Sequence, residues 1–408
     1  MGKRGGVSSL NWVVAAALVA GAGAAKAVDY PPDGLVVDLR YRWAHIDQDG
    51  YAKPANANTV RFTLGYLWQF APQFSAYAEG TRVFAVFGEH YNSGANGNTR
   101  LPSEGDPPSS EVSSAWVAWD NGTVATRLGR QYVSLDNDRF FTPGLWRQNP
   151  QSFDAVAASL KLDTGTTIKY FYLDEAQRSV GHDYPDPTQR EWQLDANLIH
   201  VDQKLPLGTL TGYGYFVEND TTSKYSWRTS GLRWTGKYQF GDSGTALGWT
   251  AEGAQQNSWR NNPQHYSADY RMLELSYGFA WASLKLGDEV LGGNGKYAFS
   301  SPYGSNHGFD GWTSQFKNTP PNGLDDRYVA AFGKIDPRLS WSVTFHNFFA
   351  EHASQRYGSE LNAMVNYALR KDLSVELDYA DYHRNTFGSS ERAFWLTLEY
   401  KIGKQGGY

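Results

Sequence analysis

The sequence predicts an all-β fold, an antiparallel up-and-down β-barrel of about 18 strands that crosses a membrane. Apolar and polar side chains alternate residue by residue over many segments, which is the period of a β-strand. The connections between these segments alternate between short turns and long polar loops, as in barrels with short periplasmic turns and long outer loops. An export signal begins the chain, and no later apolar run reaches the roughly 18 residues of a spanning helix. Together these observations place the chain in a bacterial outer membrane.

The first 27 residues have the features of a secretory signal peptide. Lys3 and Arg4 precede an apolar run over residues 12–25, and residues 25–27 read Ala-Lys-Ala, the small-x-small pattern of a cleavage site. We therefore expect a mature chain that begins at Val28. No linker-like break divides residues 28–408, which are predicted to form one barrel.

The composition excludes several classes of protein. Without residues 1–27 the formal net charge falls from −5 to −8, which argues against a general nucleic-acid binder. The chain has no cysteine, so no disulfide framework supports the fold. It carries 15 Trp, 26 Tyr and 21 Phe at a mean hydropathy of −0.55, as expected where aromatic girdles flank a barrel and only every second strand residue is apolar.

The alternation is clearest in the first strand, where Leu39 and Tyr41 share one face and Arg40 and Arg42 share the other. Period 2 of this quality indicates a strand. The same pattern predicts 18 strands over residues 35–43, 58–70, 74–88, 111–120, 123–134, 152–163, 166–174, 191–204, 208–218, 224–239, 245–256, 267–278, 282–290, 325–335, 339–350, 358–370, 373–382 and 391–402. The last of these would pair with the first and remove both sheet edges.

The long connections lie between every second pair of strands. They cover residues 89–110, 135–151, 175–190, 257–266 and 291–324. Residues 135–151 mix charges of both signs with Gly, Pro and Trp, which suits a loop packed inside a polar lumen. Residues 291–324 contain a helix-like segment around residues 310–316 and could act as a lid or cover the mouth without moving.

Two stretches resemble the alginate-export family of bacterial outer-membrane channels. The first, residues 129–155, contains GRQ, LDNDRF, WRQN and SFD in the family's order. The second, residues 307–329, contains GW, F, TP and GLDDRY placed likewise. The resemblance implies an 18-stranded barrel, loops folded into the lumen and an arginine-rich constriction that passes polysaccharide or other hydrophilic solutes.

The lumen face of the first half carries basic residues. The inward phase places Arg40, Arg42, Arg61 and Lys169 there, and the loop over residues 135–151 with its flanks adds Arg130, Arg139 and Arg147. Guanidinium groups in a confined pore orient carboxylates by forked hydrogen bonds, which predicts an anionic solute. The alternative is structural, with these arginines paired to Asp136, Asp138 and Asp154 so that they hold the loop.

The second half of the lumen face is acidic. Its inward phase carries Asp195, Glu218, Glu252, Glu274, Glu360, Glu376, Asp378 and Glu399, against Arg233 and Lys401. We expect a lumen that is basic on one wall and acidic on the other. The predicted pore-lining residues are Arg40, Arg42, Arg61, Arg130, Asp136, Asp138, Arg139, Arg147, Arg233, Glu252, Glu274 and Glu376.

Other chemistry has little support. The chain lacks HExxH, GxSxG and phosphate-loop motifs, so no catalytic residue, metal ligand or cofactor is predicted. Asp47 and Asp49 before Gly50 form only an incomplete calcium ligand set.

The favoured function is a passive outer-membrane channel for anionic oligo- or polysaccharides, alginate-like, or related organic anions. Its partners would be outer-membrane lipid and lipopolysaccharide, the solute, and periplasmic export proteins. A general or substrate-specific diffusion porin for small hydrophilic solutes is the alternative. An outer-membrane barrel enzyme and a sealed structural or adhesive barrel are the other candidates.

Overall fold

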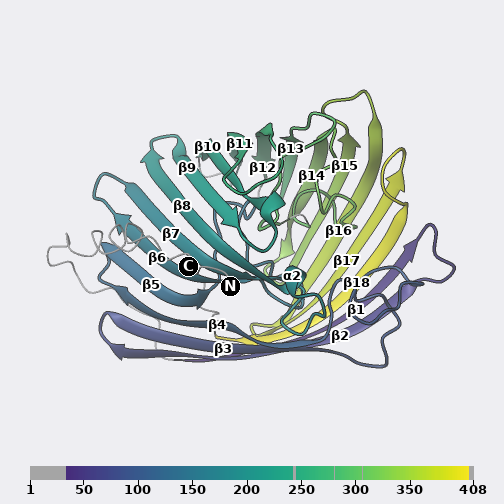
Figure 1. Cartoon of the computed structure of the whole chain (residues 1–408), viewed down its shortest axis with the longest axis horizontal. Helices are drawn as coiled ribbons and strands as arrows, with labels where there is room; N and C mark the ends of the chain where they lie inside the picture. The colour runs from purple at the N-terminus through teal and green to yellow at the C-terminus, as the bar shows by residue number, and fades with distance from the viewer. Residues whose placement is uncertain (1–33, 242–244, 280, 306, 404–408) are drawn as a thin grey trace.

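The computed structural model describes residues 34–241, 245–279, 281–305 and 307–403, which form a closed barrel of 18 antiparallel strands (Figure 1). Its first strand, β1 (Gly34–Gln48), pairs with its last, β18 (Glu391–Ile402), from Val37 opposite Ile402 to Gln48 opposite Glu391. Closure leaves no unpaired sheet edge, so every strand's backbone groups are satisfied within the barrel. The predicted fold class and strand number are confirmed. The expected signal peptide, residues 1–27, lies outside the described residues.

The strands follow one another around the barrel in chain order. Between β1 and β18 they are β2 (Ala55–Ala71), β3 (Phe74–Ala85), β4 (Ser109–Asp120), β5 (Val124–Gln131), β6 (Ser152–Lys161), β7 (Thr166–Gln177), β8 (Glu191–Leu205), β9 (Gly208–Asn219), β10 (Trp227–Gln239), β11 (Ala246–Ser258), β12 (Ser267–Gly278), β13 (Ala282–Leu291), β14 (Leu324–Asp336), β15 (Leu339–Phe349), β16 (Arg356–Arg370) and β17 (Leu373–Arg384). A helical turn, α2 (Pro187–Arg190), lies in the β7–β8 loop, and a 3-10 turn, η1 (Ser223–Tyr225), lies in the β9–β10 loop. Within the described parts of the chain, no helix has the length and apolar character to cross a membrane.

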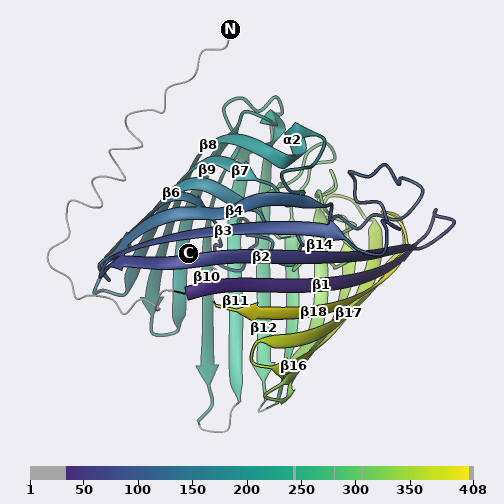
Figure 2. The same cartoon turned by 90° about the horizontal axis from the view of Figure 1, so that it is seen from below.

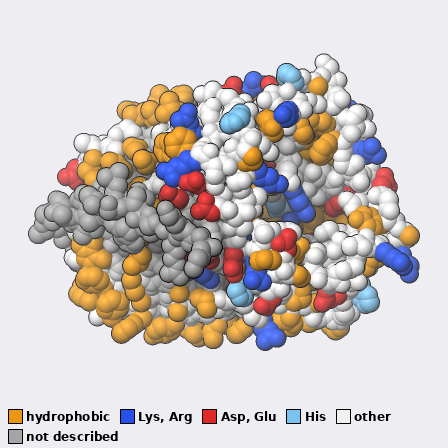
Figure 3. Space-filling model, in the orientation of Figure 1, with side chains coloured by type: hydrophobic (Ala, Val, Ile, Leu, Met, Phe, Trp, Pro, Cys, Tyr) orange, Lys and Arg blue, Asp and Glu red, His pale blue; other side chains and the backbone are white. Residues whose placement is uncertain are grey.

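The outer face of the barrel is apolar. On β2, Leu64 and Trp68 are 48% and 54% exposed, whereas Arg61 and Thr63, which alternate with the outward residues, are buried on the inner side. Hydrophobic side chains gather along the lower and left margins of the molecule in the view of Figure 3, over the outer side of the strands. Because such a surface is unfavourable in water, it indicates contact with the hydrocarbon of a bilayer.

The long loops gather at one end of the barrel, and two of them fold into it. The β5–β6 loop spans residues 132–151 and the β13–β14 loop spans residues 292–323. Figure 1 shows loop segments inside the ring of strands, and Figure 2 shows β1 to β4 running side by side across the front of the barrel. These two loops supply the candidate functional site.

The inward face of β6 to β9 is apolar near the long-loop end, contrary to the predicted polar lumen. Trp192, Leu194 and Ala196 of β8 point inward and belong to a buried cluster with side chains of both inserted loops. Asp195 and Glu218, predicted to face the lumen, therefore point outward. Both pair there with Arg260, at 3.1 and 2.6 Å. The rule that polar residues face inward fails here because the inserted loops bring their own hydrophobic core into the barrel.

The assignment of the two faces can be tested with adjacent residues of β15. Val343→Arg places a cation in hydrocarbon at a cost of about 2–4 kcal/mol near the midplane, since Val343 is exposed on the outer face. Ser342→Arg, one residue earlier, places the same side chain on the inner side. We expect Val343→Arg alone to weaken the heat-modifiable gel shift that reports the folded barrel. Equal loss in both variants would contradict the assignment.

Candidate functional site

The two inserted loops pack against each other as one unit. Phe141 of the β5–β6 loop stacks on Tyr303 of the β13–β14 loop, with ring centroids 5.5 Å apart and planes 6° apart. The Thr142 amide donates to the Tyr303 carbonyl at 3.0 Å, and the Ser305 amide donates to the Asp138 carbonyl at 2.9 Å. A shared aromatic core with backbone hydrogen bonds across it means that the loops hold their positions jointly.

Arg139 fixes this unit to the barrel wall. Its guanidinium donates to Glu289 of β13 at 2.7 Å, to Asp310 of the other loop at 3.1 Å, and to the Ser305 carbonyl at 3.0 Å. The three charged side chains are almost fully buried. Arg139 was predicted to line the pore, but it lies between the loops and the wall. Its buried charge requires these partners, so its role in the structure is to hold the loops.

Glu360, on the barrel wall in β16, binds the β13–β14 loop. Its carboxylate accepts hydrogen bonds from the amides of Trp312 and Thr313, at 2.5 and 3.1 Å, and from the Thr313 hydroxyl at 2.6 Å. The helix predicted around residues 310–316 is instead a series of turns. Gly311 and Ser314 have positive φ values of 82° and 57°, which a right-handed helix does not allow.

Two arginines of β1 and β2 grip the end of the β5–β6 loop. Arg40 pairs with Glu399 at 2.8 Å and donates to the Leu145 carbonyl, also at 2.8 Å. Arg61 pairs with Asp38 at 2.6 Å and donates to the same Leu145 carbonyl at 3.4 Å. Both guanidinium groups point inward, as predicted, and both are already occupied by carboxylates and by loop carbonyls.

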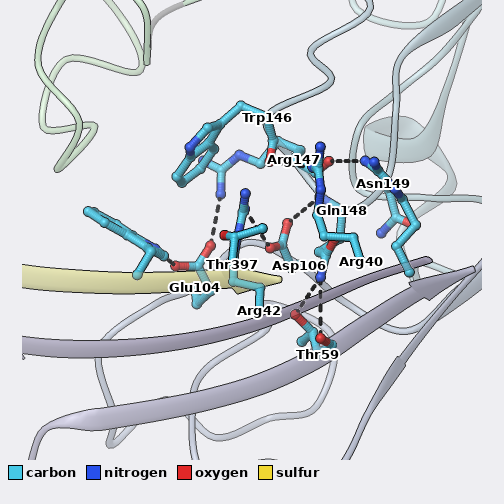
Figure 4. Close-up of polar contacts among 12 residues, drawn as sticks. Arg40, Arg42, Thr59, Glu104, Asp106, Trp146, Arg147, Gln148, Asn149 and Thr397 are labelled. Atoms are coloured by element: carbon cyan, nitrogen blue, oxygen red, sulfur yellow. Dashed lines mark hydrogen bonds and ion pairs between the residues drawn. The ribbon is translucent and has the colours of Figure 1, made fainter. Parts of the chain in front are cut away.

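Arg42 joins a third loop to this group (Figure 4). Its Nη1 lies 3.6 Å from Asp106 of the β3–β4 loop, and its Nε donates to the Thr397 hydroxyl at 3.3 Å. The other oxygen of Asp106 accepts the Gln148 amide at 3.0 Å. Arg42 also lies over the ring of Trp146, 4.5 Å from its centroid. Asp106 therefore connects β1 with the β5–β6 loop, a role that nothing in the sequence indicated.

Arg147 contacts the β3–β4 loop and lies beside a stacked aromatic pair. Its guanidinium lies 3.4 Å from the carboxylate of Glu104. Burial and the nearby Asp106 raise the pKa of Glu104, whereas the positive charge of Arg147 lowers it. Beside it, Trp146 stacks on His307 with centroids 3.6 Å apart. Burial and the charge of Arg147 hold the pKa of His307 well below its usual value, so this ring is neutral at pH 7.

Arg130 is a correction to the predicted pore lining. On β5 the neighbouring outward position, Leu128, is exposed, and Arg130 shares its side of the strand. Its guanidinium forms a forked pair with Asp154 of β6, at 2.8 Å for both bonds, and lies 3.8 Å from Glu175. Arg130 and Asp154 thus form an ion pair on the outer face near the long-loop end, away from the lumen. Gly129, the residue before Arg130, has a positive φ of 125°.

Asp136 and Asp138 do not pair with the arginines in the structure. Asp136 lies 3.0 Å from His200 Nε2, and the opposite nitrogen of that ring lies 3.6 Å from Asp202. These three residues are the group in the described part of the chain whose ligand atoms are close enough to hold a metal ion together. Asp138 accepts the Ser134 hydroxyl at 2.5 Å. Both aspartates adopt positive φ, which Asp tolerates, so they shape the turn of the loop.

The remaining predicted pore-lining residues sit on inward faces with partners on neighbouring strands. Arg233 of β10 pairs with Glu252 of β11. Glu274 of β12 pairs with Lys285 of β13 at 2.7 Å. Glu376 of β17 accepts a hydrogen bond from an asparagine side chain on β16 at 2.9 Å. Arg233 and Glu274 are therefore neutralised by charges on neighbouring strands, whereas the partner of Glu376 is a neutral amide.

Comparison with known proteins agrees with the fold. No protein-family model matches the chain. The solved structures that resemble it include OccAB4 of Acinetobacter baumannii, OpdK of Pseudomonas aeruginosa solved with vanillate, and OccK9 (OpdG) of the same organism. They share 13%, 14% and 11% identity, cover 91%, 90% and 91% of this chain and 98%, 98% and 99% of their own, and give TM-scores of 0.69, 0.69 and 0.70.

The chain therefore has the architecture of bacterial outer-membrane channels, and the bacterial outer membrane is its location. The resemblance to the alginate-export family in particular stays a prediction. A short stretch is also 34% identical over 89 residues to a probable deoxyribonuclease, RhsB, of Dickeya dadantii. That match covers 21% of this chain and only 6% of the other protein.

The role of Arg139 can be tested by removing its charge. Arg139→Met leaves the carboxylates of Glu289 and Asp310 buried without a cation, which is expected to destabilise the loop unit by about 3–5 kcal/mol. We expect faster limited proteolysis within residues 132–151 and 292–323, while the heat-modifiable shift of the barrel persists. Arg130→Met removes an arginine from the partly exposed pair on the outer face and serves as the matched control. Equal protection of the loops in both variants would show that Arg139 does not hold them.

Proposed function

We propose that the protein is a passive outer-membrane channel for small hydrophilic solutes, with a preference for organic anions. The observation that carries the proposal is the pair of loops inside a closed barrel, surrounded by ion pairs on the inner wall. Loops held in this way narrow a lumen and determine which solutes pass. OpdK, one of the similar structures, was solved with vanillate, an aromatic carboxylate, which is in line with passage of small organic anions.

The anion preference rests on the mouth of the barrel, because the arginines of the wall are paired. Lys224 of the β9–β10 loop and Lys296 of the β13–β14 loop are exposed and line neighbouring cavities at the long-loop end. Exposed cations influence ions within about 10 Å at 0.1 M salt. A positive mouth would concentrate anions ahead of a constriction that is itself close to neutral.

Passage of an alginate-like polysaccharide is the second candidate. It is favoured by hydroxyl and amide side chains, such as Thr142 and Asn318, that lie between the cations of the mouth. Uronate oligomers of increasing length distinguish the two candidates in bilayer recordings. A channel for small solutes is blocked or left unaffected by long oligomers, whereas a polysaccharide channel shows current interruptions that lengthen with the chain.

Single-channel recording in planar bilayers tests the channel proposal. We expect a steady conductance and, under a KCl gradient, a reversal potential on the anion side. The Lys224→Gln, Lys296→Gln double variant should shift that potential toward cations, since it removes two charges from the mouth. The matched control, Lys334→Gln, Lys371→Gln, removes two exposed lysines at the opposite end. Absence of a steady current would contradict the proposal that the protein is a channel. An unchanged reversal potential in the Lys224→Gln, Lys296→Gln variant would contradict the proposal that these lysines cause the anion preference.

A further inference from the structure

A cavity of ≈ 600 Å³ opens at the long-loop end of the barrel, between four loops. Its volume lies within the range of about 300–1,000 Å³ that is usual for small-molecule sites. Four basic side chains line it, from the β5–β6, β7–β8, β9–β10 and β13–β14 loops: Arg147, Arg178, Lys224 and Lys317. An adjoining cavity of ≈ 400 Å³ adds Lys296. In a chain with a net charge of −5, this is a strong local excess of positive charge.

Asp186 is the one acidic residue among the described residues that line these cavities, and its carboxylate is already engaged. It caps α2, accepting the amide and the hydroxyl of Thr188 at 2.9 and 2.7 Å and the side-chain amide of Gln189 at 2.9 Å. Fixed on its own turn, it forms no ion pair with the cations across the cavity. Arg147 pairs with Glu104, whereas the charge of Arg178 has no carboxylate partner among the residues that line the cavity.

Arg178 is the central cation. Its guanidinium lies over the ring of Trp192, 4.0 Å from the centroid, and 5.6 Å from the centroid of Tyr303. Its side-chain hydrogen bond goes to the neutral amide of Gln151, and no carboxylate in the described part of the chain pairs with it. Burial lowers its pKa to about 10, so it stays charged at pH 7. Buried charges are normally paired with an opposite charge. Arg178 differs in this respect from the arginines of the wall, which have carboxylate partners.

Its surroundings hold Arg178 in place. The Gln151 amide donates to the carbonyls of Thr142 and Tyr303, at 2.8 and 2.9 Å, which leaves its oxygen directed toward Arg178. Trp192 is held by a hydrogen bond from its indole nitrogen to the Thr188 carbonyl at 2.7 Å. A guanidinium oriented in advance by neutral groups keeps donors free for an oxyanion and loses little entropy when it binds one.

The lining also indicates the body of the ligand. Hydroxyl and amide side chains stand between the cations, among them Thr142, Ser179, Thr188, Gln189, Ser305 and Asn318. The ring of Trp192 already stacks on Arg178 and on Tyr225, whose centroid is 5.1 Å away, so it offers no open face to an aromatic ligand. Donors and acceptors at this density suit a ligand that carries many hydroxyl groups.

We infer that this cavity binds a polyhydroxylated organic anion of mono- to disaccharide size, with its carboxylate on Arg178. The inference rests on the proposed function, for which this cavity is the site that captures the solute ahead of the constriction. Lys224 supplies further positive charge around the ligand, and the hydroxyl and amide groups of the lining bind its hydroxyl groups.

The test is direct binding to the purified, folded full-length barrel in detergent, followed by calorimetry and by tryptophan fluorescence. Glucuronate and glucose have the same ring and differ by a carboxylate, benzoate is an aromatic acid, and sulfate is a bare oxyanion. We expect glucuronate to bind at least about tenfold more tightly than each of the other three, as one charge-assisted hydrogen-bonded pair would give. Arg178→Met should weaken glucuronate binding about tenfold or more, and Arg130→Met, on the outer face, should leave it unchanged.

Each outcome decides the inference. Equal binding of glucose overturns the anionic ligand, and equal binding of benzoate or sulfate overturns the hydroxylated body. If Arg178→Met does not fold, Lys224→Met at the exposed rim still has to weaken glucuronate binding. A barrel that conducts ions but does not bind glucuronate refutes this site and leaves the proposed function standing. A barrel that carries no current refutes the proposed function whether or not it binds the ligand.

Discussion

The buried contact of Arg139 with Glu289 and Asp310 is the interaction on which the interior of this barrel depends. The wall needs no help to close, because each strand is paired on both sides and the backbone is satisfied by the sheet alone. The lumen is different, because it contains two loops that are separated in the chain by residues 152–291. A single buried guanidinium joins both loops to β13, and the stacked rings of Phe141 and Tyr303 are brought together at the same junction.

The barrel itself could be predicted because its rules are local. A lipid-facing position must be apolar and its neighbours point to the other side, so the sequence of β2 or β18 alone reveals both faces. The same rule failed on β8, where Trp192 and Leu194 point inward and Asp195 points outward. It failed because those inner positions contact loop side chains rather than water, and loop insertion leaves no periodic signal in the strands that receive it.

The sequence was sufficient to predict that arginines form the candidate site, but not which residues they contact. The expectation that arginines gather around the β5–β6 loop holds for Arg40, Arg42 and Arg61, which do contact it. Their carboxylate partners could not be inferred, since Asp106 and Glu399 come from distant segments that only the closed barrel brings near. Arg130 was misplaced because it was assigned to the lumen together with the loop, whereas it lies on β5 and shares the outward side of that strand with Leu128.

These contacts divide the positive charge of the molecule into two kinds. Arginines of the wall are paired and hold loops, so they contribute little net field to the lumen. Arg178, Lys224 and Lys296 have no such compensation among the acids that line the cavities. In our account, selectivity arises at the mouth and size restriction arises at the loop unit. The loop unit is the central element, since it determines both what the cavity looks like and how wide the path beyond it is.

The most direct test of this account is the single-channel conductance of a variant that lacks residues 296–318, the part of the β13–β14 loop that contains Tyr303, Asp310 and Trp312. The strands on either side remain paired, so the heat-modifiable shift should show a folded barrel. The account predicts a clearly larger steady conductance than that of the intact protein. An unchanged conductance in a folded barrel would contradict it, because the loop would then cover the lumen without narrowing the path.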